Sequence, residues 1–144
     1  MTVTYMPCCS EDADSIFEMC REVVERYEDL TSIDPEKVLT WLQNKIKDNI
    51  RQYSRICVDG NTVGYYRLHR EGNSTELDDF YILPQWRGKG IGSAVLKDCF
   101  AQVDGDIFLY VFTANLGAVR LYQRHGFAVS EYVSKTRCIM TRKG

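Results

Sequence analysis

The fold of this chain is decided by the stretch Leu83-Pro84-Gln85-Trp86-Arg87-Gly88-Lys89-Gly90-Ile91-Gly92-Ser93. It follows a strand-like run, Thr75 to Ile82, and opens a segment, residues 91–103, whose apolar side chains recur at helical spacing. Glycines in such a turn leave backbone N–H groups free at the positive end of the helix dipole, which suits a pyrophosphate. The stretch therefore predicts a strand, a turn and a helix with an anion site at the turn.

Two familiar phosphate-binding motifs do not fit this turn. A P-loop needs Gly-Lys followed by Ser or Thr, whereas Lys89 is followed by Gly90. A dinucleotide fingerprint needs G-x-G-x-x-G, whereas the glycines at 88, 90 and 92 give G-x-G-x-G. The alternative interpretation is a tight turn without a ligand, in which Arg87 and Lys89 are solvated cations.

The rest of the chain alternates strand-like and helical segments. A first strand is expected near Val3 and Tyr5, and the hairpin signal Asp59-Gly60-Asn61 predicts a turn between two further strands. The other expected elements are helices over 12–27 and 34–50, strands over 54–58, 62–68 and 75–82, a helix over 91–103, a central strand over 107–112, a helix over 115–125, and strands near 127–133 and 135–141. This order predicts an α/β fold with a mixed sheet and helices on both faces.

Length and charge limit the class of protein. The 144 residues correspond to one ordinary domain, so residues 1–144 are expected to form a single unit. The formal net charge is −2, whereas nucleic-acid-binding domains are usually strongly basic, so no nucleic-acid partner is expected. No segment approaches about 18 consecutive apolar residues and the N-terminus lacks a secretory pattern, so neither a membrane span nor secretion is expected.

The six cysteines indicate reduced thiols in a cytoplasmic protein. No C-x-x-C occurs, and only two histidines are available to assist, so no metal site is expected. Cys57 and Cys99 are predicted to fill the core. The adjacent Cys8 and Cys9 are predicted to be exposed and mildly reactive.

Two stretches resemble the motifs of the GNAT superfamily of N-acetyltransferases. Arg87, Gly90 and Gly92 match motif A, Arg/Gln-x-x-Gly-x-Gly/Ala after a strand, and residues 115–127 resemble motif B, N-x-x-A-x-x-L-Y-x-x-x-G-F. The element order agrees as well, so the resemblance covers essentially the whole chain. It implies a splayed sheet of about seven strands, and homodimers are frequent among such proteins.

The resemblance implies a reaction in which acetyl-CoA and a primary amine of a small molecule or peptide react directly in a ternary complex, without a metal. Phe80, Tyr81 and Ile82 would pair with the pantetheine arm, an N–H near Ile82 would polarise the thioester carbonyl, and Asn115 would steady the cofactor. The pyrophosphate would lie on the backbone amides of Arg87, Gly88, Lys89, Gly90, Ile91, Gly92 and Ser93. The competing function is a regulatory module that binds acyl-CoA without turnover.

Tyr122 is the candidate general acid, since the resemblance places it where the departing CoA thiolate is protonated. Reference pKa values of about 8.5 for a thiol and about 10 for tyrosine make this transfer uphill by about 2 kcal/mol, which a site can offset. The alternative is an aromatic side chain that only packs on the inner face of a short helix.

The general base is expected among the acids of the strand that precedes the turn. Glu76 coincides with a glutamate base of some family members, Asp78 shares its face, and strand alternation places Asp79 on the other face. Other members carry an acid on the next strand, where this chain has Tyr110. A water chain and a merely solvated acidic edge are the alternatives. The three acids favour a cationic acceptor.

The two histidines, His69 and His125, are expected to lie on the surface or to pack at element ends, without moving protons.

Overall fold

The computed structural model describes residues 1–144 and contains seven strands and four α-helices in the predicted order. The strands are β1 (Val3–Pro7), β2 (Tyr53–Val58), β3 (Asn61–Glu71), β4 (Ser74–Ile82), β5 (Ile107–Phe112), β6 (Ala128–Tyr132) and β7 (Arg137–Arg142). The helices are α1 (Ala13–Tyr27), α2 (Pro35–Asp48), α3 (Ile91–Gln102) and α4 (Leu116–Arg124). The predicted fold class, α/β with a mixed sheet, is confirmed.

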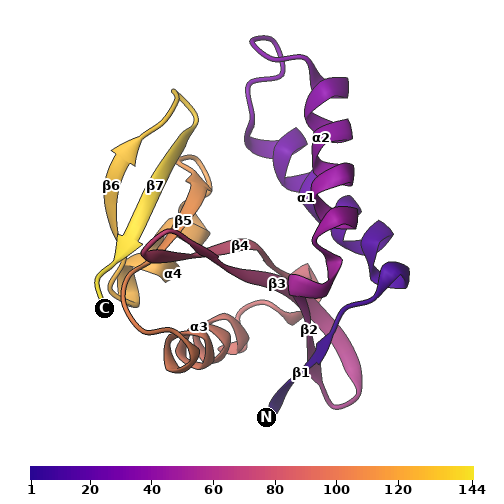
Figure 1. Ribbon diagram of the computed structural model, residues 1–144, viewed down its shortest axis with the longest axis vertical. Coiled ribbons are helices and arrows are strands. Elements are labelled where there is room, and N and C mark those ends of the chain that lie inside the picture. The colour runs from indigo at the N-terminus through magenta and orange to yellow at the C-terminus, as the bar shows by residue number, and fades with distance from the viewer.

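All seven strands form one sheet in the order β1-β2-β3-β4-β5-β7-β6. Neighbours are antiparallel except β4 and β5, which are parallel and pair only at Thr75 with Ile107 and at Glu76 with Phe108. Beyond Glu76 the two strands separate, as Figure 1 shows between β4 and β5. One edge of β4 is therefore left without a partner strand along the half that leads to the glycine turn.

Helices cover both faces of the sheet, with α1 and α2 on one side and α3 on the other (Figure 1). The larger core joins the α3 side chains Ile91, Val95 and Leu96 to the central strands, and Tyr122 of α4 belongs to it. The smaller core lies under α1 and α2 and includes the side chains of Ile16, Ile46 and Tyr53. Each amphipathic helix thus buries its apolar side against the sheet.

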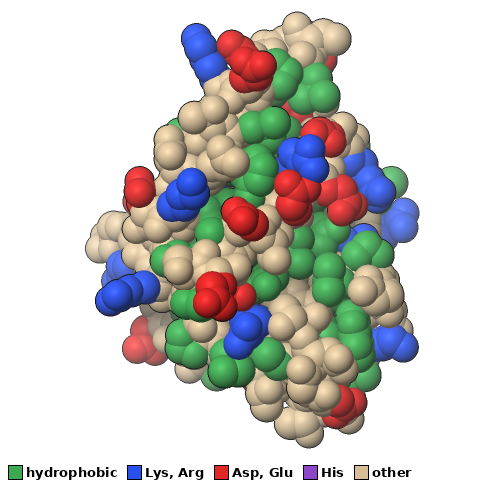
Figure 2. Space-filling model, turned by 90° about the vertical axis from the view of Figure 1, so that its right-hand side faces the viewer, with side chains coloured by type: hydrophobic (Ala, Val, Ile, Leu, Met, Phe, Trp, Pro, Cys, Tyr) green, Lys and Arg blue, Asp and Glu red, His purple; other side chains and the backbone are tan.

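The face of the molecule that carries α2 is mixed in charge. Figure 2, which views the side of the molecule that carries α2, shows acidic and basic side chains interspersed with hydrophobic ones. None of the helices combines the length and the apolar character that crossing a membrane requires.

The cysteines agree with the prediction except at one position. All six are free, and Cys57 and Cys99 are buried as expected. Cys8 is buried as well, and burial raises the pKa of its thiol to about 12. The predicted reactive pair is therefore wrong for Cys8, because a thiol needs an accessible thiolate to react.

A β-bulge interrupts β4 next to the point of separation. Tyr65 pairs with Tyr81 and Arg67 with Asp78, so the single residue Tyr66 faces both Asp79 and Phe80. Asp79 adopts φ 49°, a left-handed conformation that costs a non-glycine residue about 1–2 kcal/mol. The surrounding contacts must therefore hold this residue in place.

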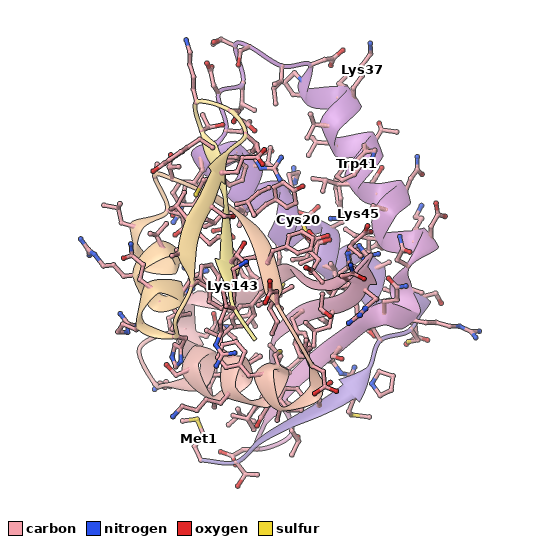
Figure 3. The ribbon with its side chains drawn as sticks, turned by 60° about the vertical axis from the view of Figure 1, so that its left-hand side comes forward. Met1, Cys20, Lys37, Trp41, Lys45 and Lys143 are labelled. Atoms are coloured by element: carbon pink, nitrogen blue, oxygen red, sulfur yellow. The ribbon has the colours of Figure 1, made fainter.

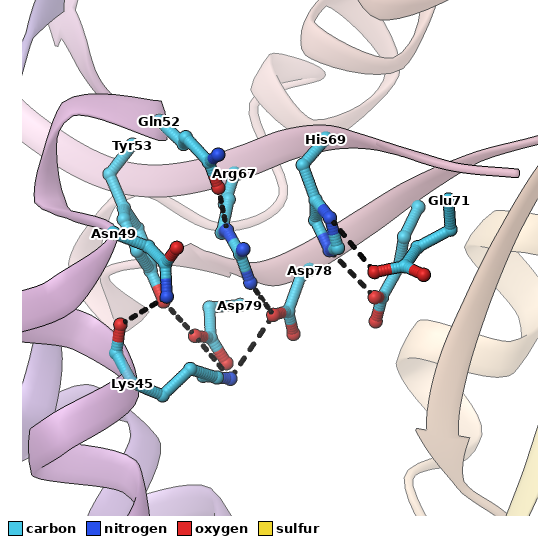
Figure 4. A network of polar contacts seen from close by, with 10 residues as sticks. Lys45, Asn49, Gln52, Tyr53, Arg67, His69, Glu71, Asp78 and Asp79 are labelled. Atoms are coloured by element: carbon cyan, nitrogen blue, oxygen red, sulfur yellow. Dashed lines mark hydrogen bonds and ion pairs between the residues drawn. The ribbon is translucent and has the colours of Figure 1, made fainter.

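Those contacts come from α2 and β2. Figure 3 places Trp41 and Lys45 on the side of α2 that faces the rest of the molecule, with Cys20 of α1 close to Lys45. The Lys45 Nζ lies 2.9 Å from a carboxylate oxygen of Asp79, and the Tyr53 hydroxyl donates to that carboxylate at 2.6 Å (Figure 4). Burial alone would raise the pKa of Asp79, but Lys45 and the Tyr53 hydroxyl outweigh it and lower that pKa.

Gly64 permits the close approach of β3 to β4. A Cβ atom there would lie 2.0 Å from the Tyr81 carbonyl oxygen, so Gly64→Ala must displace β4. We expect it to lower the free energy of unfolding by about 1–3 kcal/mol, measured by denaturant titration. The control is Gly117→Ala, whose Cβ would meet nothing within 4 Å in α4. Gly117→Ala should raise the free energy of unfolding by about 0.5–1 kcal/mol. Equal effects of Gly64→Ala and Gly117→Ala would contradict the close approach of β3 to β4.

Replacing Lys45 by Met should show how much stability is lost when the buried acids have no cation beside them. Lys45→Met leaves Asp79 buried without its cation, so we expect a loss of about 3–5 kcal/mol in the free energy of unfolding at pH 7. Because the folded-state pKa of Asp79 is lowered, its contribution is present above the unfolded value of about 3.9 and is lost below it. The difference from wild type should therefore shrink as pH falls below about 4. Lys47→Met, on the exposed side of α2, should change stability little at either pH.

Candidate functional site

The separated half of β4 presents free backbone groups to the gap beside it. The Leu83 N–H donates to the Val63 carbonyl at 2.8 Å, so it points toward β3. Successive peptide groups of a strand point to opposite sides, so the Ile82 N–H points to the side that β5 has left. This supports the predicted role of the backbone at Phe80, Tyr81 and Ile82 as an edge for an extended ligand.

The glycine turn leaves a row of backbone N–H groups without protein acceptors at the start of α3. None of the six successive N–H groups from Gly88 to Ser93 donates to a protein acceptor. Gly88 and Gly90 have φ values of 74° and 82°, which glycine adopts at no steric cost. The Arg87 N–H is different, since it donates to the Pro84 carbonyl at 3.2 Å. Of the N–H groups predicted to hold an anion, that of Arg87 is therefore taken by the protein itself, whereas those of Gly88–Ser93 are free.

Gly92 has a packing role that the sequence did not indicate. The motif suggests that its small size serves only the ligand, but a Cβ atom there would lie 3.1 Å from Leu121 Cδ2 of α4. Gly92 thus allows α3 and α4 to pack closely. A Cβ at Gly88 or Gly90 would meet nothing within 4 Å, so glycine is favoured at these two positions by the positive φ and not by lack of space.

Arg87 folds back on the end of β4. Its Nε donates to the Ile82 carbonyl at 2.9 Å, and its guanidinium lies 5.0 Å from the centre of the Tyr81 ring. The Tyr81 hydroxyl in turn donates to Glu22 of α1 at 2.7 Å. An open cavity of about 630 Å³ lies here, between the acidic outer side of α1 and the residues Tyr81, Leu83 and Pro84. Substrate-sized space therefore adjoins the predicted cofactor edge.

Motif B forms α4, which faces the same region. Asn115 is its N-cap, and the Asn115 side chain accepts a hydrogen bond from the Ala118 N–H at 3.4 Å. Tyr122 is buried in the larger core, and its ring packs edge-on against Phe127 at 5.6 Å between centroids. Burial raises the pKa of Tyr122, so its hydroxyl remains a proton donor at any working pH. The cost of the transfer to a thiolate rises accordingly.

Glu76 occupies the point where β4 and β5 separate, because its pairing with Phe108 is the last between these strands. Its side chain is 14% exposed and lies 2.8 Å from Nε2 of His69. Burial, followed by the charge of Asp78, raises the pKa of Glu76, while His69 partly offsets the rise. A carboxylate with a raised pKa is a better base, so the environment suits the predicted role of Glu76. Of the two placements expected for His69, the surface or packing at an element end, the structure shows the second: the side chain is 10% exposed near the end of β3, with Nε2 beside this acid.

Asp78 is engaged differently. Its Oδ2 lies 3.1 Å from Nζ of Lys45 and 3.1 Å from Nη1 of Arg67. The bulge also brings Asp79 to the same side, where it shares Lys45, so the expected placement of Asp79 on the opposite face is wrong. The two cations leave one net negative charge among these acids and bases, less than the three acids alone suggested.

The spacing of three side chains also satisfies a first test for a metal site. Ligand atoms of His69, Glu76 and Asp78 lie within 4.8 Å of one another. Asp78, however, already neutralises Lys45 and Arg67, and a divalent cation beside two fixed positive charges would be repelled. The set fits proton handling better than metal binding.

Sequence reasoning missed Lys45, Tyr53 and Arg67, which hold the acids in place. Lys45 and Asp78 are 33 positions apart, and nothing local links them. One signal was available: Arg67 stands between Tyr66 and Leu68 inside a predicted strand, where an unpaired charge would be costly. Tyr110, which stands where other family members carry an acid, is 43% exposed and lies under the guanidinium of Arg137.

Comparisons with curated proteins find acetyltransferases. Spermine/spermidine N(1)-acetyltransferase of Bacillus subtilis (strain 168) is 39% identical over 82 residues, which are 48% of this chain and 54% of the relative. L-amino acid N-acetyltransferase AaaT of Escherichia coli (strain K12) is 27% identical over 82 residues, which are 51% of each chain. The chain thus spans about half the length of the curated relatives it matches.

Solved structures share the fold over the whole chain. The PaiA N-acetyltransferase of Thermoplasma acidophilum, in complex with coenzyme A, aligns with a TM-score of 0.75 and 21% identity over 100% of both chains. N-acetylglutamate synthase of Neisseria gonorrhoeae, complexed with coenzyme A and N-acetyl-glutamate, aligns with a TM-score of 0.72 and 16% identity over 99% of this chain and 35% of that chain. At these identities the likeness shows the fold.

A family model described as the acetyltransferase (GNAT) family matches residues 15–127. This match takes in the bulge, the glycine turn and Tyr122, so sequence and geometry point to one conclusion. The chain belongs to the acetyltransferase (GNAT) family.

Proposed function

We propose that this protein is an acetyl-CoA-dependent N-acetyltransferase that acts on a primary amine of a small molecule or a peptide. The observation that supports it most is the row of six free N–H groups, Gly88 to Ser93, which continues the open edge of β4. A pyrophosphate suits the row, because the groups lie at and just before the N-terminus of α3, where the helix dipole favours an anion. A pantetheine arm suits the open edge, because its amides can replace those of a neighbouring strand.

The chemistry follows from this placement. The amine nitrogen attacks the thioester carbon, and the Ile82 N–H stabilises the negative charge that develops on the carbonyl oxygen. Glu76 takes the proton that the acceptor ammonium must lose, directly or through water. When the C–S bond breaks, the Tyr122 hydroxyl protonates the thiolate of CoA. Asp78 is the weaker candidate for the base, because Lys45 and Arg67 hold its charge.

The acceptor in this proposal is cationic. The one net negative charge that remains near Glu76 attracts a single ammonium group more than a neutral amine. Trp41 of α2, which is 62% exposed and lies 5.2 Å from Lys45 Nζ, offers an aromatic face beside these acids. The relatives named for spermine or spermidine and for L-amino acids both act on amines, which is consistent with this class.

Compartment and assembly complete the proposal. The six free cysteines suit the reducing cytoplasm, where we place the protein. Strand β6, at the edge of the sheet, is exposed along its whole length and leaves one side unpaired, which suits a homodimer.

Acetyl-CoA should bind and stabilise the protein without added metal. At a hundredfold excess over Kd, linkage gives about 2.7 kcal/mol, a rise of several degrees in Tm by scanning calorimetry. S-acetylpantetheine, which lacks the pyrophosphate, should give a far smaller shift at the same concentration. Equal shifts from the two ligands would contradict the proposed pyrophosphate site. A screen of amines with acetyl-CoA distinguishes the two candidate functions. An enzyme should release CoA thiol steadily, whereas a module that only binds acyl-CoA should release none.

Replacing Tyr122 by Phe removes one hydroxyl and leaves the packing against Phe127 in place. We expect Tyr122→Phe to lower kcat by about 10²–10⁴-fold while the Kd for acetyl-CoA stays within twofold, because only proton donation is lost. Steady-state kinetics and calorimetry measure the two quantities. Tyr132→Phe, at an exposed tyrosine of β6, is the matched control and should leave both unchanged. An unchanged kcat in Tyr122→Phe would assign that residue to packing alone.

A further inference from the structure

A row of three titratable side chains leads from the apex of the β4–β5 gap to the protein surface. Glu76 and His69 face each other across β4 and β3, with Nε2 of His69 2.8 Å from Oε1 of Glu76. The other ring nitrogen, Nδ1, lies 3.5 Å from Oε1 of Glu71 (Figure 4). The exposed fractions of the side chains are 14% for Glu76, 10% for His69 and 59% for Glu71. The row therefore joins a nearly buried acid to solvent through one imidazole.

The charges around His69 favour passage of a proton. Its own strand supplies Glu71, β4 supplies Glu76 and Asp78, and α2 supplies Lys45. Lys45 and Arg67 both form ion pairs with Asp78, so Glu71 and Glu76 are the carboxylates that contact the His69 ring. Each nitrogen of the ring therefore has a carboxylate oxygen beside it.

The proposed reaction needs such a path. An alkylammonium acceptor loses one proton in each turnover, and Glu76 lies at the narrow end of the gap, away from its open side. When both substrates fill the gap, bulk water can no longer take that proton from Glu76 on the substrate side. A path that leads the proton from Glu76 toward β3, on the side away from the substrates, would let it reach water.

We propose that Glu76, His69 and Glu71 form a proton exit path. It rests on the proposed function, in which Glu76 is the base. The proton on Glu76 passes to Nε2 of His69, the resulting imidazolium gives its Nδ1 proton to Glu71, and Glu71 releases it to water. The relay leaves the ring protonated at Nε2, and proton exchange with water returns it to the Nδ1–H tautomer before the next turnover. One proton moves and no electrons are exchanged, so the path needs no further reactant. His69 acts through Glu76 and touches no substrate.

The test compares His69→Gln with wild type in steady-state acetyl transfer to an amine found in the screen. Glutamine retains a hydrogen-bond donor for Glu76 but cannot pass a proton on. We expect kcat to fall at least tenfold, with KM for acetyl-CoA within twofold. In Glu71→Gln, kcat should fall less than in His69→Gln and should recover as the buffer concentration rises. The control is Glu131→Gln, at an exposed acid of β6, whose kcat should equal that of wild type. A kcat of His69→Gln equal to wild type would overturn the path.

Chemical rescue separates proton transfer from loss of structure. His69→Ala should regain a large part of its kcat in millimolar imidazole, with no change in Tm. A deficit that imidazole leaves untouched would overturn the path and assign His69 to packing. Glu76→Gln separates the path from the function: it should be inactive and insensitive to imidazole. If wild type transfers no acetyl group, the acetyltransferase function fails. If wild type is active and Glu76→Gln is fully active, the path and the role of Glu76 as base are overturned, while the acetyltransferase function stands.

Discussion

The ion pair between Lys45 and Asp79 is the contact on which the rest of the site depends. It holds a residue of β4 in a left-handed conformation, and the resulting bulge sets the direction in which the strand runs past β5. It also ties α2, from the N-terminal third of the chain, to the strand that carries the chemistry. Buried pairs add little net stability over apolar packing, but they fix geometry when both partners are present. Here that geometry decides which face each acid presents.

The same contact sorts three neighbouring acids into different tasks. Asp79 is held by Lys45 and Tyr53, and Asp78 by Lys45 and Arg67, so both keep their charge for the network. Glu76 has a histidine in place of a fixed cation, and burial shifts its pKa in the opposite direction. The pKa values of Glu76 and Asp79, only three positions apart, are thus shifted in opposite directions, and their partners come from β3, α2 and β2. The environment, more than the residue type, separates structural acids from a candidate base.

The fold and the glycine turn before α3 could be predicted from the sequence, because both rest on local patterns. The glycines at 88, 90 and 92 precede a helical period, and the order of elements follows from alternation and turn residues. Contacts between distant segments could not be predicted in this way. The bulge interrupts the alternation from which the opposite face was expected for Asp79. The partial burial of His69 depends on the pairing of β3 with β4, and the burial of Cys8 on its packing against α1. Gly92 shows the remaining limit, since one residue serves the motif and the packing of α4 at once.

An unpaired strand edge usually invites another chain to add to the sheet, and proteins protect such edges with charge. The edge of β4 must stay open for a ligand, so it cannot be covered permanently. Arg87 meets both requirements, because its side chain donates a hydrogen bond to the Ile82 carbonyl and places a positive charge at the edge of β4. A guanidinium on a flexible stem is easily displaced by a ligand, whereas a second protein strand would have to bury it. The resting protein is thereby protected from aggregation through the surface that it needs for binding.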